Sequence, residues 1–150
     1  MTHNPLAASP AFKGKSQNGL YGDATEELDW SMGVLLETLK EEGLDQNTLV
    51  IFTSDNGADE HFGGTNRPLR GQKGTTYEGG FRVPCIMRWP AKIPAGQETD
   101  NLVTSMDFLP TLAHYCGYAV PSDRVIDGHN VSGILEGESM ESPTETFYYY

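Results

Sequence analysis

The chain has few cysteines and no long apolar run. Its 150 residues include two cysteines, Cys85 and Cys116, which allow at most one disulfide and form no CxxC pair. A disulfide scaffold and a cysteine-based zinc site are therefore both disfavoured. No apolar stretch reaches the roughly 20 residues that cross a bilayer, and the first residues lack the apolar core of a signal peptide. The residues themselves show no membrane span and no export signal.

Positive charge is also scarce. Ten Lys and Arg residues stand against 21 Asp and Glu residues, which gives a net charge of -11. Long-range repulsion would slow the encounter with nucleic acid or an anionic membrane, so we expect neither as a partner. An anionic ligand would have to be held locally. Four of the ten basic residues fall in one window, namely Arg67, Arg70, Lys73 and Arg82.

What the sequence does contain is typical of one globular α/β core. The clearest helix is expected over residues 23–43, with Asp23 as N-cap, Glu26 completing a capping box and Gly43 ending it. An apolar stripe at helical spacing is predicted to pack in the core. Its members are Leu28, Met32, Leu35, Leu36 and Leu39.

Two strands and a second helix are expected after this helix. Residues 49–53 form a continuous apolar and β-branched run, which favours a strand buried on both faces, as in a parallel sheet covered by helices. A helix followed by such a strand indicates the α/β class. Residues 81–90 are expected to hold a second strand, and residues 103–117 a helix capped by Thr104 or Ser105. Between the strands, residues 57–80 are predicted to be a long functional loop.

An acidic pair follows the first predicted strand. Asp55 and Asn56 place adjacent oxygen donors where ligands bind in open α/β sheets, beyond the carboxyl ends of the strands. Carboxylate and amide oxygens suit Ca²⁺ or Mg²⁺ better than zinc. The tripeptide Asp-Asn-Gly is also a common turn, so the residues alone leave both interpretations open.

The basic window adds a second kind of group. Lys73 lies among glycines, which allow a point charge and backbone N–H groups to approach an oxyanion. A metal and a lysine facing one site would together neutralise a bound ester anion. The alternative is that the arginines pair with Glu78 and other acids, and we expect this of Arg82.

The motif "SDNG", followed by "PLRGQKGTTYEGGFRVP", resembles the second half of the sulfatase domain, in the branch of arylsulfatase A and N-acetylgalactosamine-6-sulfatase. The resemblance extends to "THNP" and "FKGKSQNGLYGDATEELDWSMG" before it and to "PSDRVIDG" and "FYYY" after it. It implies an alkaline-phosphatase-like α/β fold with a mixed, mostly parallel sheet flanked by helices. Residues 1–150 are then expected to be a partial catalytic domain, truncated at both ends.

The resemblance also implies roles for single residues. Asp55 and Asn56 match the family's late pair of Ca²⁺ ligands, with Mg²⁺ the less favoured ion, and Lys73 matches the lysine that holds the sulfate oxygens. His3, in "HNP", matches the histidine that hydrogen-bonds the sulfate ester and helps protonate the leaving alcohol, a task that suits an imidazole. The other histidines match no catalytic position: His61 is expected in a loop by the substrate entrance, His114 in a helix and His129 in a turn.

The family's nucleophile has no match in the chain. It is a formylglycine made from a residue in a Cys-x-Pro-x-Arg-like motif, and neither Cys85 nor Cys116 lies in one. Both cysteines are expected to be ordinary buried residues. The early Asp-Asp calcium ligands and the early Lys and His pair are absent too. We therefore expect formylglycine in a part of the protein upstream of this chain, and no turnover by the chain alone.

The function implied is a Ca²⁺-assisted sulfatase that hydrolyses sulfate monoesters of small molecules or glycans. One alternative is a phosphomonoesterase or phosphodiesterase of the wider alkaline-phosphatase-like superfamily, against which the "GQKGTTYEGG" loop argues. The other is a non-catalytic relative that retains an anion pocket. Such enzymes are mostly secreted, periplasmic or lysosomal. The residues name no natural substrate and no oligomeric state.

Overall fold

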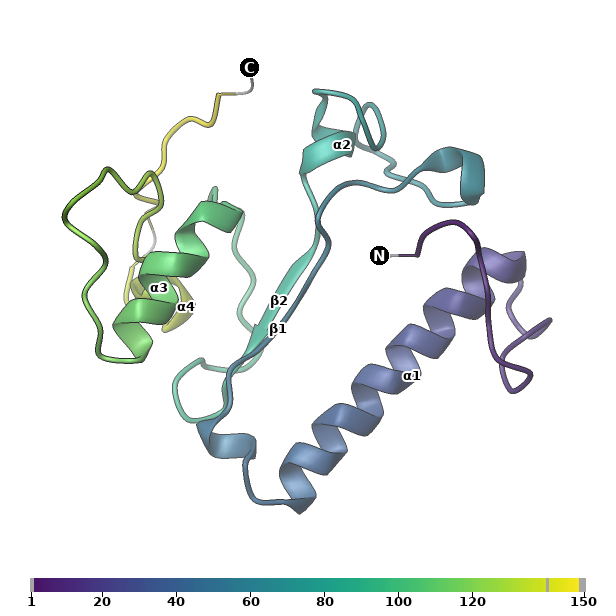
Figure 1. Ribbon diagram of the computed structural model, residues 1–150, viewed down its shortest axis with the longest axis horizontal. Helices are drawn as coiled ribbons and strands as arrows, with labels where there is room; N and C mark the ends of the chain where they lie inside the picture. The colour runs from purple at the N-terminus through teal and green to yellow at the C-terminus, as the bar shows by residue number, and fades with distance from the viewer. Residues whose placement is uncertain (1, 140, 149–150) are drawn as a thin grey trace. The chain divides into compact units, whose positions relative to one another are not determined.

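The structure is a computed structural model that describes residues 2–139 and 141–148. The chain divides into two compact units, Met1–Ile86 and Met87–Tyr150. The first holds the long helix α1 (Figure 1). It also holds all four predicted site residues, His3, Asp55, Asn56 and Lys73. In the part of the chain that is described, no helix combines the length and the apolar character that a membrane span needs.

Helix α1, Gly19–Glu41, begins four residues before the predicted start. Asp23 therefore lies inside the helix, where it is 2% exposed, and the prediction that it is the N-cap was wrong. Its carboxylate instead accepts hydrogen bonds from the backbone N–H groups of Gly14 at 2.7 Å, Lys15 at 3.0 Å and Ser16 at 2.8 Å. The side chain thus closes the preceding turn onto the helix.

This arrangement predicts a pH dependence of stability. Hydrogen bonds from the backbone of Ser16 and Gly14 lower the pKa of Asp23. A lowered folded-state pKa stabilises the fold above the ordinary carboxyl range, and this contribution is lost as the pH falls through the lowered value. We expect Asp23→Asn to remove that part of the acid sensitivity. Denaturant unfolding between about pH 2 and 6 measures it.

A matched control for Asp23→Asn is Asp29→Asn, which removes an exposed carboxylate from the same helix. The control variant should keep the pH dependence of the unmodified chain. If the Asp23 variant lost stability with acid in parallel with the unmodified chain, the assigned role of the carboxylate would be wrong.

The end of α1 confirms the predicted stop at Gly43. This glycine has a φ of +70°, its N–H donates to Lys40 O at 3.1 Å, and Leu44 N–H donates to Leu39 O at 2.8 Å. The predicted core packing of the apolar stripe was wrong for Leu35, which is 45% exposed. The other four members of the stripe are half-buried. Among the described residues, the buried apolar side chains all lie in the second unit.

Two strands form the sheet, β1 at Val50–Thr53 and β2 at Cys85–Arg88. The chain runs along β1 away from the end of α1 and returns along β2 after the long loop. The two strands are therefore antiparallel (Figure 1). Burial of β1 on both faces was a wrong expectation, since all four of its residues are half-buried. Cys85 and Cys116 are exposed, which corrects their expected burial. A mostly parallel arrangement stays a prediction, because only this pair is described.

The region between the strands contains short helical turns within the predicted loop. They are η2 at Glu60–Phe62 and α2 at Glu78–Phe81, and a further turn, η1 at Asp45–Asn47, precedes β1.

The second unit contains the predicted helix as two consecutive elements, η3 at Ser105–Asp107 and α3 at Phe108–Tyr115. Thr104 caps them in a capping box with Asp107, as predicted for this position. His114 lies in α3, as expected. The short helix α4, Ser132–Leu135, was not predicted, because one turn is too short to show a helical period.

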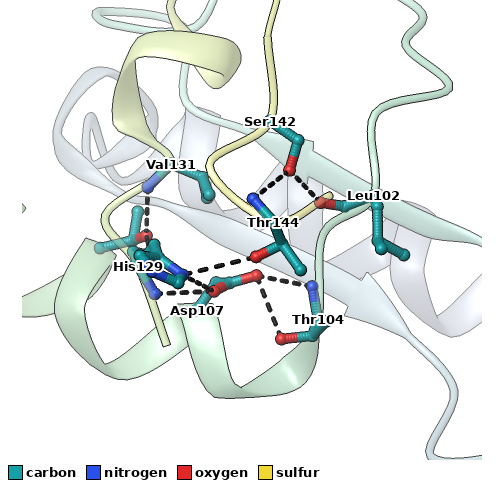
Figure 2. Close-up of polar contacts among 8 residues, drawn as sticks. Leu102, Thr104, Asp107, His129, Val131, Ser142 and Thr144 are labelled. Carbon is teal, nitrogen blue, oxygen red and sulfur yellow. Dashed lines mark hydrogen bonds and ion pairs between the residues drawn. The ribbon is translucent and has the colours of Figure 1, made fainter. Parts of the chain in front are cut away.

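A buried carboxylate joins the beginning of α3 to the segment before α4. Asp107 is 1% exposed and accepts hydrogen bonds from the N–H groups of Thr104 and His129, both at 2.7 Å (Figure 2). Beside it, Val131 N–H donates to the Thr111 hydroxyl at 3.0 Å. His129, expected in a turn, lies instead in an irregular segment, and its ring Nδ1 is 3.9 Å from Asp107 Oδ1. These contacts give Asp107 and His129 a structural role in this unit.

Candidate active site

Lys73 lies in a tight turn that is tied to the segment after β1. Within the turn, Thr75 N–H donates to Gln72 O at 3.0 Å and the Thr75 hydroxyl donates to the same oxygen at 2.8 Å. Lys73 N–H donates to Ala58 O at 3.2 Å. The backbone of the lysine is therefore fixed, while its half-buried side chain leaves the turn.

Asn66 reinforces the same connection. Its side-chain amide accepts from Ala58 N–H at 2.7 Å and donates to Ala58 O at 2.9 Å, so it pairs with that residue as a neighbouring strand would. Asn66 was not among the predicted site residues. A lone asparagine in a polar loop carries no signal that distinguishes it from other turn residues.

Two of the loop glycines, Gly79 and Gly80, serve packing inside the loop. Gly79 N–H donates to Arg70 O at 2.8 Å and Gly80 N–H donates to Tyr77 O at 2.8 Å, so both groups are used inside the loop. A Cβ on Gly79 would lie 2.1 Å from Gly71 O. Only glycine allows this approach of one backbone to another.

Arg82 is paired as predicted, and Arg70 is held in a different way. Arg82 pairs with Glu78 at 3.6 Å, one helical turn away. Arg70 instead stacks on Tyr77, with its guanidinium carbon 3.8 Å from the ring centre, and donates to the Tyr77 hydroxyl at 2.7 Å. The expected pairing with acids therefore holds for Arg82, while Arg70 is held by an aromatic ring.

The structure brings His3 and Lys73 together, although 70 residues separate them. The distance from Lys73 Nζ to His3 Nε2 is 2.8 Å. The other ring nitrogen, Nδ1, lies 2.8 Å from Asn4 O, and a carbonyl oxygen can only accept. Nδ1 therefore carries the hydrogen, and Nε2 accepts from the lysine ammonium. Next to His3, the Thr2 hydroxyl contacts the Thr25 hydroxyl on α1 at 3.1 Å.

A shallow hollow lies beside His3. It measures about 250 Å³ and is lined by Thr2, His3, Pro5, Leu6, Ala7, Ala24 and Leu28. The lining is mostly aliphatic, and His3 supplies its titratable group. The His3 ring thus has an apolar hollow and Lys73 as neighbours.

Asp55 and Asn56 follow β1 by two and three residues, as predicted. The Asp55 side chain is exposed and Asn56 is half-buried. Within the described ranges, neither side chain has a hydrogen-bond or ion-pair partner. Two adjacent free oxygen donors fit a hard cation such as Ca²⁺. They form only part of its shell, since Ca²⁺ takes 6–8 oxygen ligands.

A wider metal cluster does not occur in the described part of the chain. No group of three or more His, Cys, Asp or Glu side chains is placed to hold a metal ion there. The remaining ligands of a cation at Asp55 and Asn56 would have to come from groups other than these side chains.

Asp59 and His61 form a further polar pair near Lys73. Asp59 Oδ1 accepts from His61 N–H at 3.0 Å and lies 2.9 Å from His61 Nδ1. Hydrogen bonds from the His61 side chain lower the pKa of Asp59 most, and the charge of Lys73 lowers it further. His61 lies in η2. Asp59 was not predicted as a site residue, because no pattern distinguishes it from the other Asp and Glu residues among the 21 in the chain.

Comparison with known proteins places the chain in a family. The family model described as Sulfatase matches residues 1–118. Human steryl-sulfatase is 46% identical over 99% of this chain, and canine N-acetylgalactosamine-6-sulfatase is 45% identical over 99%. The crystal structure of PsFucS1 sulfatase from Pseudoalteromonas sp. aligns with a TM-score of 0.87 and 35% identity over 99% of the chain.

The chain belongs to the sulfatase family. The match confirms the resemblance and the α/β fold class expected from the sequence. The chain spans 27% of the length of human steryl-sulfatase, 29% of canine N-acetylgalactosamine-6-sulfatase and 30% of PsFucS1.

Proposed function

We propose that the protein containing this chain is a sulfatase that hydrolyses sulfate monoesters. The observation that carries the proposal is the 2.8 Å contact between Lys73 Nζ and His3 Nε2. These are the two residues to which the family resemblance gives sulfate-binding roles, and they come from opposite ends of the first unit. Membership of the sulfatase family supports the same reaction.

The two side chains suit complementary parts of a sulfate ester. The Lys73 ammonium offers three donors and a compact positive charge for the non-bridging sulfuryl oxygens. The His3 imidazole, once protonated at Nε2, would donate to the bridging oxygen and pass its proton to the departing alcohol. A sulfate group between them would replace the Lys73–His3 hydrogen bond and compensate the positive charge on both sides.

Asp55 and Asn56 are the residues of this chain that would hold the family's metal ion, which we assign as Ca²⁺. When bound, the ion would polarise the sulfate group and orient the nucleophile. The exposed Asp55 carboxylate and the Asn56 amide supply oxygen ligands, as hard cations require. Since neither is engaged elsewhere among the described residues, metal binding would break no observed contact.

The nucleophile is assigned to a part of the protein outside this chain. Cys85 lies in β2 and Cys116 directly follows α3, and neither lies in the motif from which formylglycine is made. The chain alone is therefore proposed to bind anions without turning over esters. The substrate is proposed to be a sulfated small molecule or glycan.

The proposal is tested by assaying the whole protein with 4-nitrophenyl sulfate and 4-nitrophenyl phosphate. Release of inorganic sulfate with little release of phosphate is expected. A preference for the phosphate ester would favour the phosphoesterase alternative. Hydrolysis of neither ester, with inorganic sulfate still bound at Lys73, would favour a non-catalytic anion-binding protein.

Metal removal should abolish most of this activity. Chelation by EGTA takes away the cation expected at Asp55 and Asn56, and added Ca²⁺ should restore turnover more fully than Mg²⁺, because Mg²⁺ demands a stricter octahedral geometry. Asp55→Asn should raise the Ca²⁺ concentration needed for half-maximal activity. Asp45→Asn, which changes a carboxylate before β1, is the control. Full activity after chelation would contradict the metal assignment.

A further inference from the structure

The Asp59–His61 pair is the polar cluster near Lys73 that the proposed chemistry does not use. Asp59 lies between two anchored residues: Ala58 O accepts from Lys73 N–H at 3.2 Å, and Glu60 N–H donates to Gln72 Oε1 at 3.1 Å. These two hydrogen bonds tie the backbone on either side of Asp59 to the turn that carries the lysine.

The pair has unused hydrogen-bonding capacity. Both contacts of Asp59 with His61 use the same oxygen, Oδ1. Within residues 2–139 and 141–148, the second carboxylate oxygen and the His61 Nε2 have no hydrogen-bond partner. The His61 side chain is 77% exposed and that of Asp59 is 33% exposed. An acceptor and a ring nitrogen are thus open to a ligand.

The negative charge of Asp59 limits the kinds of ligand that would fit this pair. The positive charge of Lys73 contributes to the lowered pKa of the Asp59 carboxyl group. A carboxylate at this position would accept hydrogen bonds from the hydroxyl groups of a ligand. Contact with an apolar ring would remove water from the carboxylate without replacing its hydrogen bonds, which is unfavourable. The carboxylate would also repel a second anionic group on the same substrate.

We propose that Asp59 and His61 hydrogen-bond the hydroxyl groups of the alcohol that carries the sulfate, and so select sugar sulfates over sulfates of apolar alcohols. This inference rests on the proposed function. The relatives do not decide between these substrate classes. A steryl-sulfatase is 46% identical to this chain and an N-acetylgalactosamine-6-sulfatase is 45% identical. Identity alone therefore does not separate the two substrate classes, whereas these side chains would.

The experiment compares kcat/KM for galactose 6-sulfate and for 4-methylumbelliferyl sulfate in the whole protein. Asp59→Asn keeps a good N-cap for η2 while exchanging an acceptor oxygen for a donor, and His61→Phe removes the ring nitrogens. Loss of a hydrogen bond to a charged group predicts a fall of about tenfold to a hundredfold for the sugar sulfate. The kcat/KM for the aryl sulfate should change by less than about threefold. The control variant Glu60→Gln, next to Asp59, should leave kcat/KM unchanged for both substrates.

Equal losses on both substrates would mean that the pair only supports the loop, and no loss on either would mean that it does not contact substrate. Both results overturn the inference. If the unmodified protein hydrolyses no sulfate ester, the proposed function fails, and binding decides the inference separately. Galactose 6-sulfate should then shift the His61 ring resonances in an NMR titration, while inorganic sulfate should shift those of His3 alone. Unmoved His61 resonances with galactose 6-sulfate would also overturn it.

Discussion

Lys73→Ala in the whole protein should lower the turnover of sulfate esters by about 10²–10³-fold, the usual loss when one preorganised donor to a developing oxyanion is removed. The side chain ends 2.8 Å from His3 Nε2, so its removal takes away the charge that would face the sulfuryl oxygens. The backbone N–H that binds Ala58 O is retained. We expect the fold to survive.

The measurement is kcat and KM with 4-nitrophenyl sulfate, together with a thermal unfolding curve. Lys13→Ala, which removes an exposed lysine from the segment before α1, is the matched control and should leave both unchanged. Lys73→Arg should recover little activity, because a planar guanidinium replaces a compact ammonium. Near-normal turnover of Lys73→Ala with an intact fold would refute the role.

His3→Gln should give a loss that depends on the leaving alcohol. Glutamine can hydrogen-bond but cannot transfer a proton, and general acid catalysis typically contributes about 10²–10⁴-fold. We expect a loss of that order for alkyl and sugar sulfates, whose alkoxides leave poorly without a proton. 4-Nitrophenyl sulfate should be affected much less, since 4-nitrophenolate is a stable leaving group.

The readout for His3 is the slope of log kcat/KM against the acidity of the leaving alcohol, which should become steeper in the variant. His114→Gln changes a histidine in α3 of the second unit and should leave the slope unaltered. A uniform loss across all leaving groups would assign His3 to binding alone.

The sequence predicted well where short-range rules decide the structure. Gly43 ends α1 and Thr104 caps η3, because positive φ and side-chain capping depend on a few neighbouring residues. The position of Asp55 and Asn56 after β1 was also predicted from a local pattern, the apolar and β-branched run of residues 49–53. The sequence pattern alone could not show that His3 lies against Lys73, since 70 residues separate them and the pairing came only through the family resemblance.

Two of the errors, at Asp23 and Gly79, share a physical cause, because contacts with other segments overrode local preference. Asp23 was predicted to be an N-cap, but its carboxylate accepts hydrogen bonds from three backbone N–H groups of the preceding turn. Gly79 reads as part of an anion cradle, yet its missing side chain admits Gly71 O. Helical periodicity predicted that Leu35 is buried, and it is exposed. A periodic pattern shows that one face of a helix is apolar, but it does not show what packs against that face.

His3 and Lys73 are proposed to bind one sulfate group. A crystal structure of the whole protein with sulfate bound would show whether they do. We expect Lys73 Nζ and His3 Nε2 both to lie within about 3.2 Å of oxygens of the same sulfate, which then separates the two side chains. A sulfate bound elsewhere, with the direct contact between His3 and Lys73 intact, would contradict this proposal.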